Sequence, residues 1–187
     1  MITHTVGAVL AGGQSSRMGS DKAALEYQNA AFIDHILATM SLVLSEIVVC
    51  GGTHEGRVPV LSDPIENAGP LGGVLAALNH SNGRPVVVVP TDMPLVSVEL
   101  IQRLAHPQLS GSETRVARAG DQIQPLCAAY GHGVGTVIAD RLERSMRSAM
   151  GLIESLPSVD YVETDPHTLT NINTPQEYEA LTEAWQK

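Results

Sequence analysis

The sequence predicts an α/β protein whose central sheet is mostly parallel and covered by helices. Short apolar runs such as "VVVV" alternate with longer stretches whose apolar residues recur at helical spacing. This alternation is typical of parallel strands joined by crossover helices. The length of 187 residues fits one domain, and no repeat or linker divides it, so we expect a single domain over residues 1–187.

The expected elements follow one another along the whole chain. Strands are expected at four apolar runs of the first half: 5–10, 47–50, 58–61 and 86–89. Crossover helices are expected between them, at 31–45 and 70–80. The second half is expected to extend the same sheet with a helix near 97–105, strands near 115–119 and 126–130, a long helix over 134–150, a strand at 159–162 and a terminal helix opened by Thr174-Pro175. An exposed loop is expected at 106–114.

Composition excludes several classes of partner. A formal net charge of -9 and an aromatic share of 3% offer neither the basic footprint nor the stacking surfaces of a nucleic-acid binder. No apolar run approaches the roughly 20 residues of a membrane span, and no basic segment precedes the first one, so we expect a cytoplasmic protein without membrane contact. Cys50 and Cys127 are isolated and are expected to pack as small hydrophobic residues.

The stretch "AGGQSSRMGSDK" follows the first predicted strand, at the sheet edge where ligands collect in open parallel sheets. Gly12 and Gly13 lack the Cβ that would keep an anion from the backbone amides. Arg17 and Lys22 are the only arginine and lysine among the first 56 residues. The alternative interpretation, an exposed surface turn with solvated side chains, does not explain why these two cations lie so close together in sequence. The stretch therefore predicts a phosphate site, although neither the Walker loop nor Gly-x-Gly-x-x-Gly is present.

Asp92 comes directly after another apolar strand, in "VVVVPTDMPLV", between Pro90 and Pro94. Mg²⁺ needs only one or two protein carboxylates when substrate phosphates complete its coordination, so Asp92 is a candidate magnesium ligand. Position alone supports equally well a residue that caps a nearby helix or forms a turn.

Two further segments have alternative interpretations. In "LSDPIENAGPLGGVLAAL", Gly72 and Gly73 either let a helix pack close to the sheet or expose backbone to a nucleoside, with Asp63 accepting a hydrogen bond. In "NINTP", residues 171–175, Asn173 and Thr174 are expected to cap the terminal helix. The alternative places an asparagine of this motif in the site.

These motifs together resemble the molybdenum cofactor guanylyltransferase family. "LAGGQSSRMGSDKAAL" is similar to the opening signature of that family, and "DPIENAGPLGGVLAAL", "PTDMPLV", "QPLCAAY" and "NINTPQEY" resemble its later blocks in the same order. The resemblance implies a three-layer, Rossmann-like nucleotide-diphospho-sugar-transferase fold. The implied reaction moves GMP from GTP onto the terminal phosphate of molybdopterin carrying molybdenum and releases pyrophosphate.

The resemblance also implies roles for particular residues. Leu10, Ala11, Gly12 and Gly13 correspond to the nucleotide-binding strand end and loop, Lys22 to a phosphate-binding lysine, Asp63 to a nucleotide contact and Asp92 to the Mg²⁺ ligand. We expect Lys22, Arg17 and Asp92 to carry the chemistry. Cofactor-delivery proteins and molybdoenzymes are the implied protein partners. The chain departs from the family at Cys50-Gly51-Gly52, where an asparagine often follows the second strand.

Two rival functions remain at this point. Another nucleotidyltransferase, of the cytidylyl or sugar-nucleotide type, would share the loop and differ in base and acceptor. A protein that binds nucleotides without reacting them is the second rival, but it would not need Arg17, Lys22 and Asp92 together.

Overall fold

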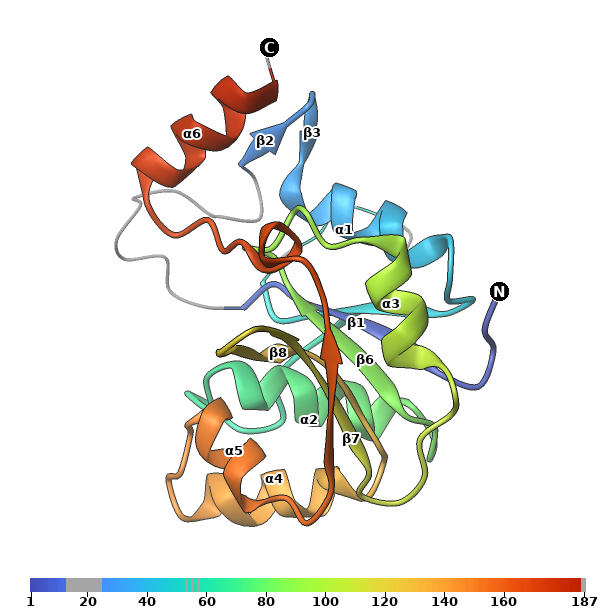
Figure 1. The fold of residues 1–187 in the computed structure, drawn as a ribbon. Helices are drawn as coiled ribbons and strands as arrows, with labels where there is room; N and C mark the ends of the chain where they lie inside the picture. The colour runs from blue at the N-terminus through green and yellow to red at the C-terminus, as the bar shows by residue number, and fades with distance from the viewer. Residues whose placement is uncertain (13–24, 53, 55, 57, 186–187) are drawn as a thin grey trace.

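The computed structural model describes residues 1–12, 25–52, 54, 56 and 58–185. Within them one sheet runs through the molecule in the order β5-β4-β1-β6-β8-β7-β9, and a separate hairpin pairs β2 with β3 (Figure 1). The strand bounds are β1 Val6–Leu10, β2 Glu26–Tyr27, β3 Ala30–Ala31, β4 Ile47–Cys50, β5 Val60–Leu61, β6 Val86–Pro90, β7 Thr114–Ala119, β8 Gln122–Tyr130 and β9 Val159–Glu163.

The sheet is mostly parallel, as the sequence predicts. β1 lies between β4 and β6 and pairs parallel with both, with Ala8 opposite Val48 and Val88. β8 is antiparallel to its neighbours β6 and β7, and β9 returns to the common direction beside β7. The carboxyl ends of β1, β4, β5 and β6 therefore meet at one edge of the sheet.

Helices cover both faces of this sheet, which gives the expected three layers. In Figure 1, α1 and α3 lie on one face, and α2, α4 and α5 lie on the other. The helix bounds are α1 Phe32–Ser41, α2 Pro70–His80, α3 Val98–Ala105, α4 Val134–Glu143, α5 Ala149–Ser155 and α6 Pro175–Trp185, with a short 3₁₀ helix, η2, at Pro166–Leu169. None of the helices in the described ranges is long and apolar enough to cross a membrane.

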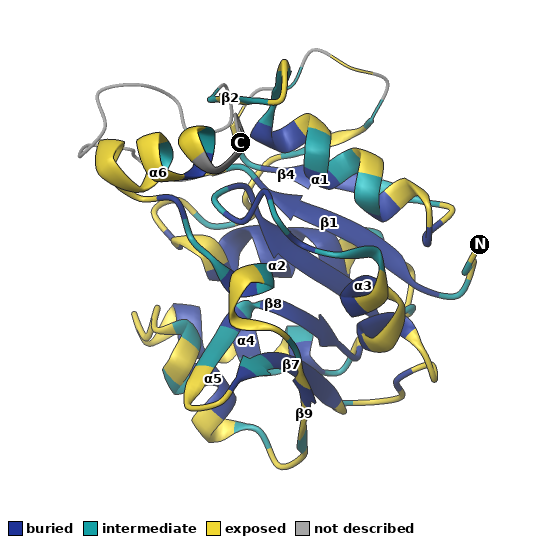
Figure 2. Cartoon of the chain, turned by 45° about the horizontal axis from the view of Figure 1, so that its top comes forward, coloured by how far each residue is buried: buried dark blue, intermediate teal, exposed yellow. Residues whose placement is uncertain are grey.

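The apolar strands are buried because alternate residues pack into separate cores. Val9, Val87 and Val89 pack with α1 and α3, whereas Ala8 and Val88 pack with α2 and α4. Figure 2 accordingly shows the central strands in the colour of buried residues. A strand that is buried on both faces has a continuous apolar sequence, which is why its position could be predicted.

The structure differs from the expected elements in three places. The helix expected over 134–150 is two helices, because Ser145 adopts a left-handed φ of 59° and the Ser148 hydroxyl caps α5 by accepting from Gly151 N at 3.0 Å. The strand expected at 58–61 covers only Val60–Leu61. The β2–β3 hairpin was not expected, and its turn is made by Gln28 and Asn29 at φ values of 50° and 62°.

Both cysteines are buried and unpaired, as the sequence predicts. Burial raises the pKa of each thiol to about 12, and the charge of Asp63 adds to the pKa shift of Cys50. Both thiols are therefore neutral at physiological pH and contribute to packing.

Candidate nucleotide site

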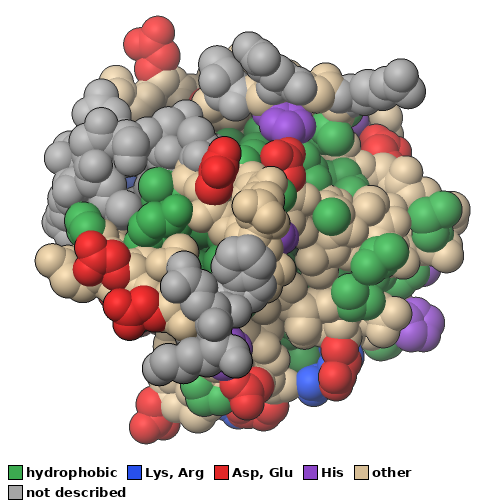
Figure 3. All heavy atoms as spheres, turned by 90° about the horizontal axis from the view of Figure 1, so that it is seen from above, with side chains coloured by type: hydrophobic (Ala, Val, Ile, Leu, Met, Phe, Trp, Pro, Cys, Tyr) green, Lys and Arg blue, Asp and Glu red, His purple; other side chains and the backbone are tan. Residues whose placement is uncertain are grey.

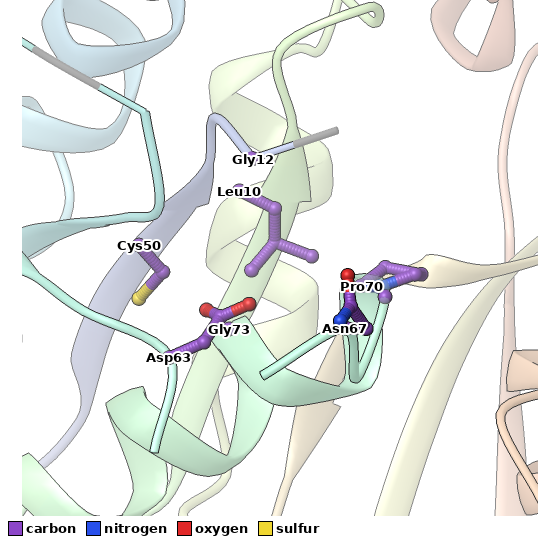
Figure 4. Close-up of a pocket in the computed structure, with 8 residues that line it drawn as sticks. Leu10, Gly12, Cys50, Asp63, Asn67, Pro70 and Gly73 are labelled. Atoms are coloured by element: carbon purple, nitrogen blue, oxygen red, sulfur yellow. The ribbon is translucent and has the colours of Figure 1, made fainter. Parts of the chain in front are cut away.

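A pocket of about 390 Å³ opens at the carboxyl ends of β1 and β4, beside the start of α2 (Figure 4). Its lining comes from four chain segments that the topology brings to one sheet edge. The lining residues are Leu10, Gly12, Cys50, Asp63, Asn67, Gly69, Pro70 and Gly73. This edge is the place where the sequence predicts a ligand.

The end of β1 is held between β4 and β6 by close backbone contacts. Ala11 N–H donates to Cys50 O at 2.9 Å, and Thr91 N–H donates to Leu10 O at 3.1 Å. A Cβ on Gly51 would lie 2.8 Å from Gly12 Cα, and a Cβ on Gly52 would lie 2.9 Å from Ala11 O. Both glycines also have left-handed φ values, of 73° and 64°. Only glycine allows the turn after β4 to pack this closely on the stem of the loop.

Of the predicted site residues, Leu10, Gly12 and Asp63 line this pocket, whereas Ala11 and Asp92 are not among its lining residues. Gly13, Arg17 and Lys22, which the sequence predicts to continue this site, lie outside the described residues. The described lining residues contain one carboxylate, Asp63, and no lysine or arginine. Figure 3 views the molecule from the side of α6 and the β2–β3 hairpin, where acidic side chains stand out in red. A polyanionic ligand in this pocket therefore needs positive charge from outside the described lining.

Asp63 lies over the first turn of α2. A Cβ on Gly72 would lie 2.8 Å from Asp63 Oδ2, and a Cβ on Gly73 would lie 3.0 Å from the Leu10 side chain. The two glycines therefore let both the Asp63 carboxylate and the sheet approach the helix, which supports the packing interpretation of this pair. Partial burial raises the pKa of Asp63 above its ordinary value.

The N-terminus of α2 borders the same pocket through Gly69 and Pro70. Pro70 occupies the first helical position, and no described side chain caps this end of the helix. The first turn of a helix carries partial positive charge and amide donors that suit an anion or an oxygen-rich ligand. At this end of the pocket, a ligand would therefore be contacted mainly by backbone N–H groups.

Asn67 is a lining residue that the sequence interpretation missed. It adopts a left-handed φ of 56° two residues before Gly69, whose φ is 66°. Its position close to Gly69, Gly72 and Gly73 is the signal that could have identified it, since asparagine adopts a left-handed backbone more readily than most residues.

Asp92 lies in the turn after β6, at the same sheet edge. β6 pairs with β1 so that Pro90 is opposite Leu10, and Asp92 follows two residues later, half-buried. The idea that Asp92 caps the next helix is wrong, because Ser97 occupies that position and accepts from Leu100 N at 3.1 Å. In the described part of the chain, no group of three metal-ligating side chains gathers around it or elsewhere.

The "NINTP" motif lies next to this turn. Ile172 N–H donates to Asp92 O at 2.8 Å, and Gln124 Nε2 donates to Asn171 Oδ1 at 3.2 Å. Thr174 caps α6 as expected, because its hydroxyl accepts from Glu177 N at 3.2 Å. The motif thus begins a helix and also contacts the site edge through its backbone.

Fold and site together define the class of protein. An open, mostly parallel sheet that carries a glycine-rich strand end, a helix N-terminus and a carboxylate at one edge is the arrangement of a nucleotide-binding α/β protein. A family model described as a MobA-like NTP transferase domain matches residues 7–159. The chain belongs to the MobA-like NTP transferase family and is a nucleotidyltransferase.

Named relatives match almost the whole chain. The molybdenum cofactor guanylyltransferase of Photobacterium profundum is 31% identical over 182 residues, which cover 93% of each chain. The crystal structure of molybdopterin-guanine dinucleotide biosynthesis protein A from Archaeoglobus fulgidus has a TM-score of 0.80 at 22% identity and covers 97% of this chain and 98% of that one.

A cytidylyltransferase has a similar fold. The crystal structure of 2-C-methyl-D-erythritol 4-phosphate cytidylyltransferase from Thermus thermophilus has a TM-score of 0.70 at 16% identity, over 96% of this chain and 98% of that one. These two structures confirm the predicted nucleotidyltransferase fold, which guanylyl and cytidylyl enzymes share.

Proposed function

We propose that this protein transfers GMP from GTP to the terminal phosphate of molybdopterin carrying molybdenum and releases pyrophosphate. The observation that carries the proposal is the pocket in which Leu10, Gly12 and Asp63 meet the start of α2. The name of the Photobacterium relative supports guanine as the base and the molybdenum cofactor as the acceptor. We further propose that residues 1–187 act as one nucleotidyltransferase domain.

On this proposal the described pocket binds the nucleoside end of GTP. Leu10, Ala11 and Gly12 present backbone, and the Asp63 carboxylate accepts hydrogen bonds from ribose hydroxyl or base N–H donors. The first turn of α2 supplies amide dipoles from the other side. Gly13, Arg17 and Lys22 follow in sequence and are assigned to the phosphates.

Asp92 is the residue that would hold a divalent metal, which we propose to be Mg²⁺. Its hard carboxylate oxygens, and its place two residues after Pro90 at the carboxyl edge of the sheet, fit such an ion. When bound there, the metal would neutralise negative charge on phosphate oxygens. Pro90 and Pro94 restrict the turn that carries Asp92, so its position is fixed by the backbone.

The proposed chemistry needs no side-chain nucleophile. An oxygen of the acceptor phosphate attacks the α-phosphorus of GTP, the bond from that phosphorus to the bridging oxygen breaks, and pyrophosphate leaves. The acceptor oxygen is already anionic, so the protein must position two polyanions and offset their charge. Arg17 and Lys22 are proposed to do the latter. We place the reaction in the cytoplasm, which the two buried, unpaired thiols support.

The test compares GTP, CTP and ATP in calorimetric titrations with Mg²⁺, followed by pyrophosphate release with the molybdopterin acceptor. We expect selective binding of GTP, a loss of about tenfold in affinity for Asp63→Asn, and loss of turnover without loss of folding for Lys22→Ala. Asp160→Asn, on the exposed strand β9, is the matched carboxylate control and is expected to bind GTP as the wild type does. Preference for CTP would instead favour the cytidylyl rival, and binding without pyrophosphate release would favour the rival that does no chemistry.

A further inference from the structure

Residues 171–178, here called the C-terminal strap, connect the turn that carries Asp92 to the β2–β3 hairpin. At its first end the strap is anchored next to Asp92. Ile172 is 1% exposed, and its N–H donates to Asp92 O at 2.8 Å. Asn171 is held from the other side, because its Oδ1 accepts from Gln124 Nε2 at 3.2 Å.

The middle of the strap is a capping box that fixes the direction in which α6 leaves. Glu177 N–H donates to Thr174 Oγ1 at 3.2 Å, while Glu177 Oε2 accepts from the N–H groups of Thr174 and Asn173 at 2.9 and 2.7 Å. Pro175 stands at the first helical position, where its fixed φ suits the helix. These reciprocal bonds tie the segment before α6 to the first turn of the helix.

At its second end the strap reaches the β2–β3 hairpin, as Figure 1 shows for α6. Tyr178 OH donates to Glu26 O at 2.7 Å, and its ring lies 6.1 Å from the Phe32 ring, centroid to centroid. Leu181 and Phe32 are buried in the same small cluster, with Ile172. The hairpin is thus packed against α6.

The hairpin needs this support because it is very small. β2 and β3 pair over Glu26 opposite Ala31 and Tyr27 opposite Ala30, and an isolated two-stranded hairpin is marginal in water. Glu26 follows Lys22 by four positions in sequence. Glu26 is therefore close in sequence to a residue that the proposed function assigns to the phosphates.

We propose that Tyr178 is a positioning residue for nucleotidyl transfer. Its hydroxyl fixes Glu26 and the hairpin, and through the strap it fixes them relative to the turn that carries Asp92. The inference rests on the proposed function, since it assigns Lys22 and Asp92 to the reacting phosphates. The nucleoside pocket is lined by other segments, so the role of Tyr178 lies in the rate of transfer rather than in the binding of GTP.

The test uses Tyr178→Phe, which keeps the ring against Phe32 and removes the hydroxyl alone. We expect kcat to fall roughly two- to tenfold, the range that one net hydrogen bond supports, while the Kd for GTP stays within about twofold. Amide hydrogen exchange in residues 25–31 of the nucleotide-free protein is expected to rise by a similar factor. Tyr161→Phe, on the exposed strand β9, is the control and should change neither quantity.

Three results would overturn the inference: unchanged kcat, equal losses in kcat and in GTP affinity, or unchanged exchange in residues 25–31. A wild-type protein without transfer activity would overturn the proposed function itself. The exchange experiment needs no nucleotide, so in that case it still decides whether Tyr178 holds the hairpin.

Discussion

Replacing Gly51 by alanine tests whether the close contact between the two glycine turns shapes the nucleotide pocket. A non-glycine residue at the left-handed φ of 73° costs about 1–2 kcal/mol. The added Cβ would also lie 2.8 Å from Gly12 Cα and 3.0 Å from Gly12 N, well inside the optimal carbon separation of about 3.5–4.0 Å. Both atoms are backbone, so no rotamer change relieves the overlap.

Gly83 separates the two contributions. It has a φ of 85°, and an ideal Cβ there would meet nothing within 4 Å. Gly83→Ala should therefore lower the free energy of unfolding by about 1–2 kcal/mol from backbone strain alone. Gly51→Ala adds the overlap, which costs about 1–3 kcal/mol in packed sites, for a total of about 2–5 kcal/mol.

The assay is urea unfolding of both variants, followed by GTP titration under conditions in which both remain folded. We expect Gly51→Ala to lower GTP affinity about tenfold or more, because it displaces Ala11 and Gly12, whereas Gly83→Ala should bind GTP normally. Equal destabilisation of the two variants, or normal GTP binding by Gly51→Ala, would refute the reasoning that the contact sets the position of the loop.

The remaining predictions concern charge. Burial raises the pKa of Asp63, so the folded state binds a proton more readily than the unfolded state does. The free energy of unfolding therefore falls as the pH rises from 3.8 through the folded pKa. Asp63→Asn should unfold at a higher urea concentration than the wild type at pH 7 and should lose this pH dependence. The hydrogen bond from Arg84 to Glu46 lowers the pKa of Glu46, so its stabilisation holds above the unfolded value of 4.5 and is lost as pH falls through the folded pKa. Glu46 is 39% exposed, so Glu46→Gln should cost less than about 1 kcal/mol at pH 7, read from urea midpoints between pH 7 and 3. Arg141 is 7% exposed, and its Nε has no hydrogen-bond partner among the described residues. Arg141→Met should therefore raise the free energy of unfolding by about 1 kcal/mol. Lower midpoints of thermal and urea unfolding would contradict this.

The sequence could predict the parts of the fold that are determined by local pattern. Val86 to Val89 form a continuous apolar run because both faces of β6 are covered, and no other element type explains such a short run between turn residues. The pocket at the end of β1 lies where the same pattern predicts a ligand, because parallel topology fixes which strand ends meet. Thr174 could be identified as a cap because the capping pattern is local too.

What the sequence could not predict depends on contacts between distant segments. The break between α4 and α5 depends on the conformation of Ser145, which apolar periodicity does not encode. The hairpin at Glu26–Ala31 exists in the context of α6, and Tyr178 is more than 150 positions away. Likewise, the role of Gly51 is visible only once β1 and β4 are known to be neighbours that bring it onto Gly12.

On the proposed function, nucleoside binding and phosphate transfer depend on different residues of the site. The described pocket uses backbone, a helix end and one carboxylate, a set that can hold a nucleoside but cannot offset the charge of a triphosphate and a second phosphate. On the proposed function, Arg17, Lys22 and a metal at Asp92 supply that positive charge. Variants of Gly51 and Asp63 should therefore act mainly on Kd for GTP, and variants of Lys22, Asp92 and Tyr178 mainly on kcat. A Tyr178 variant that changed only Kd would place the strap with the nucleoside pocket and contradict this division.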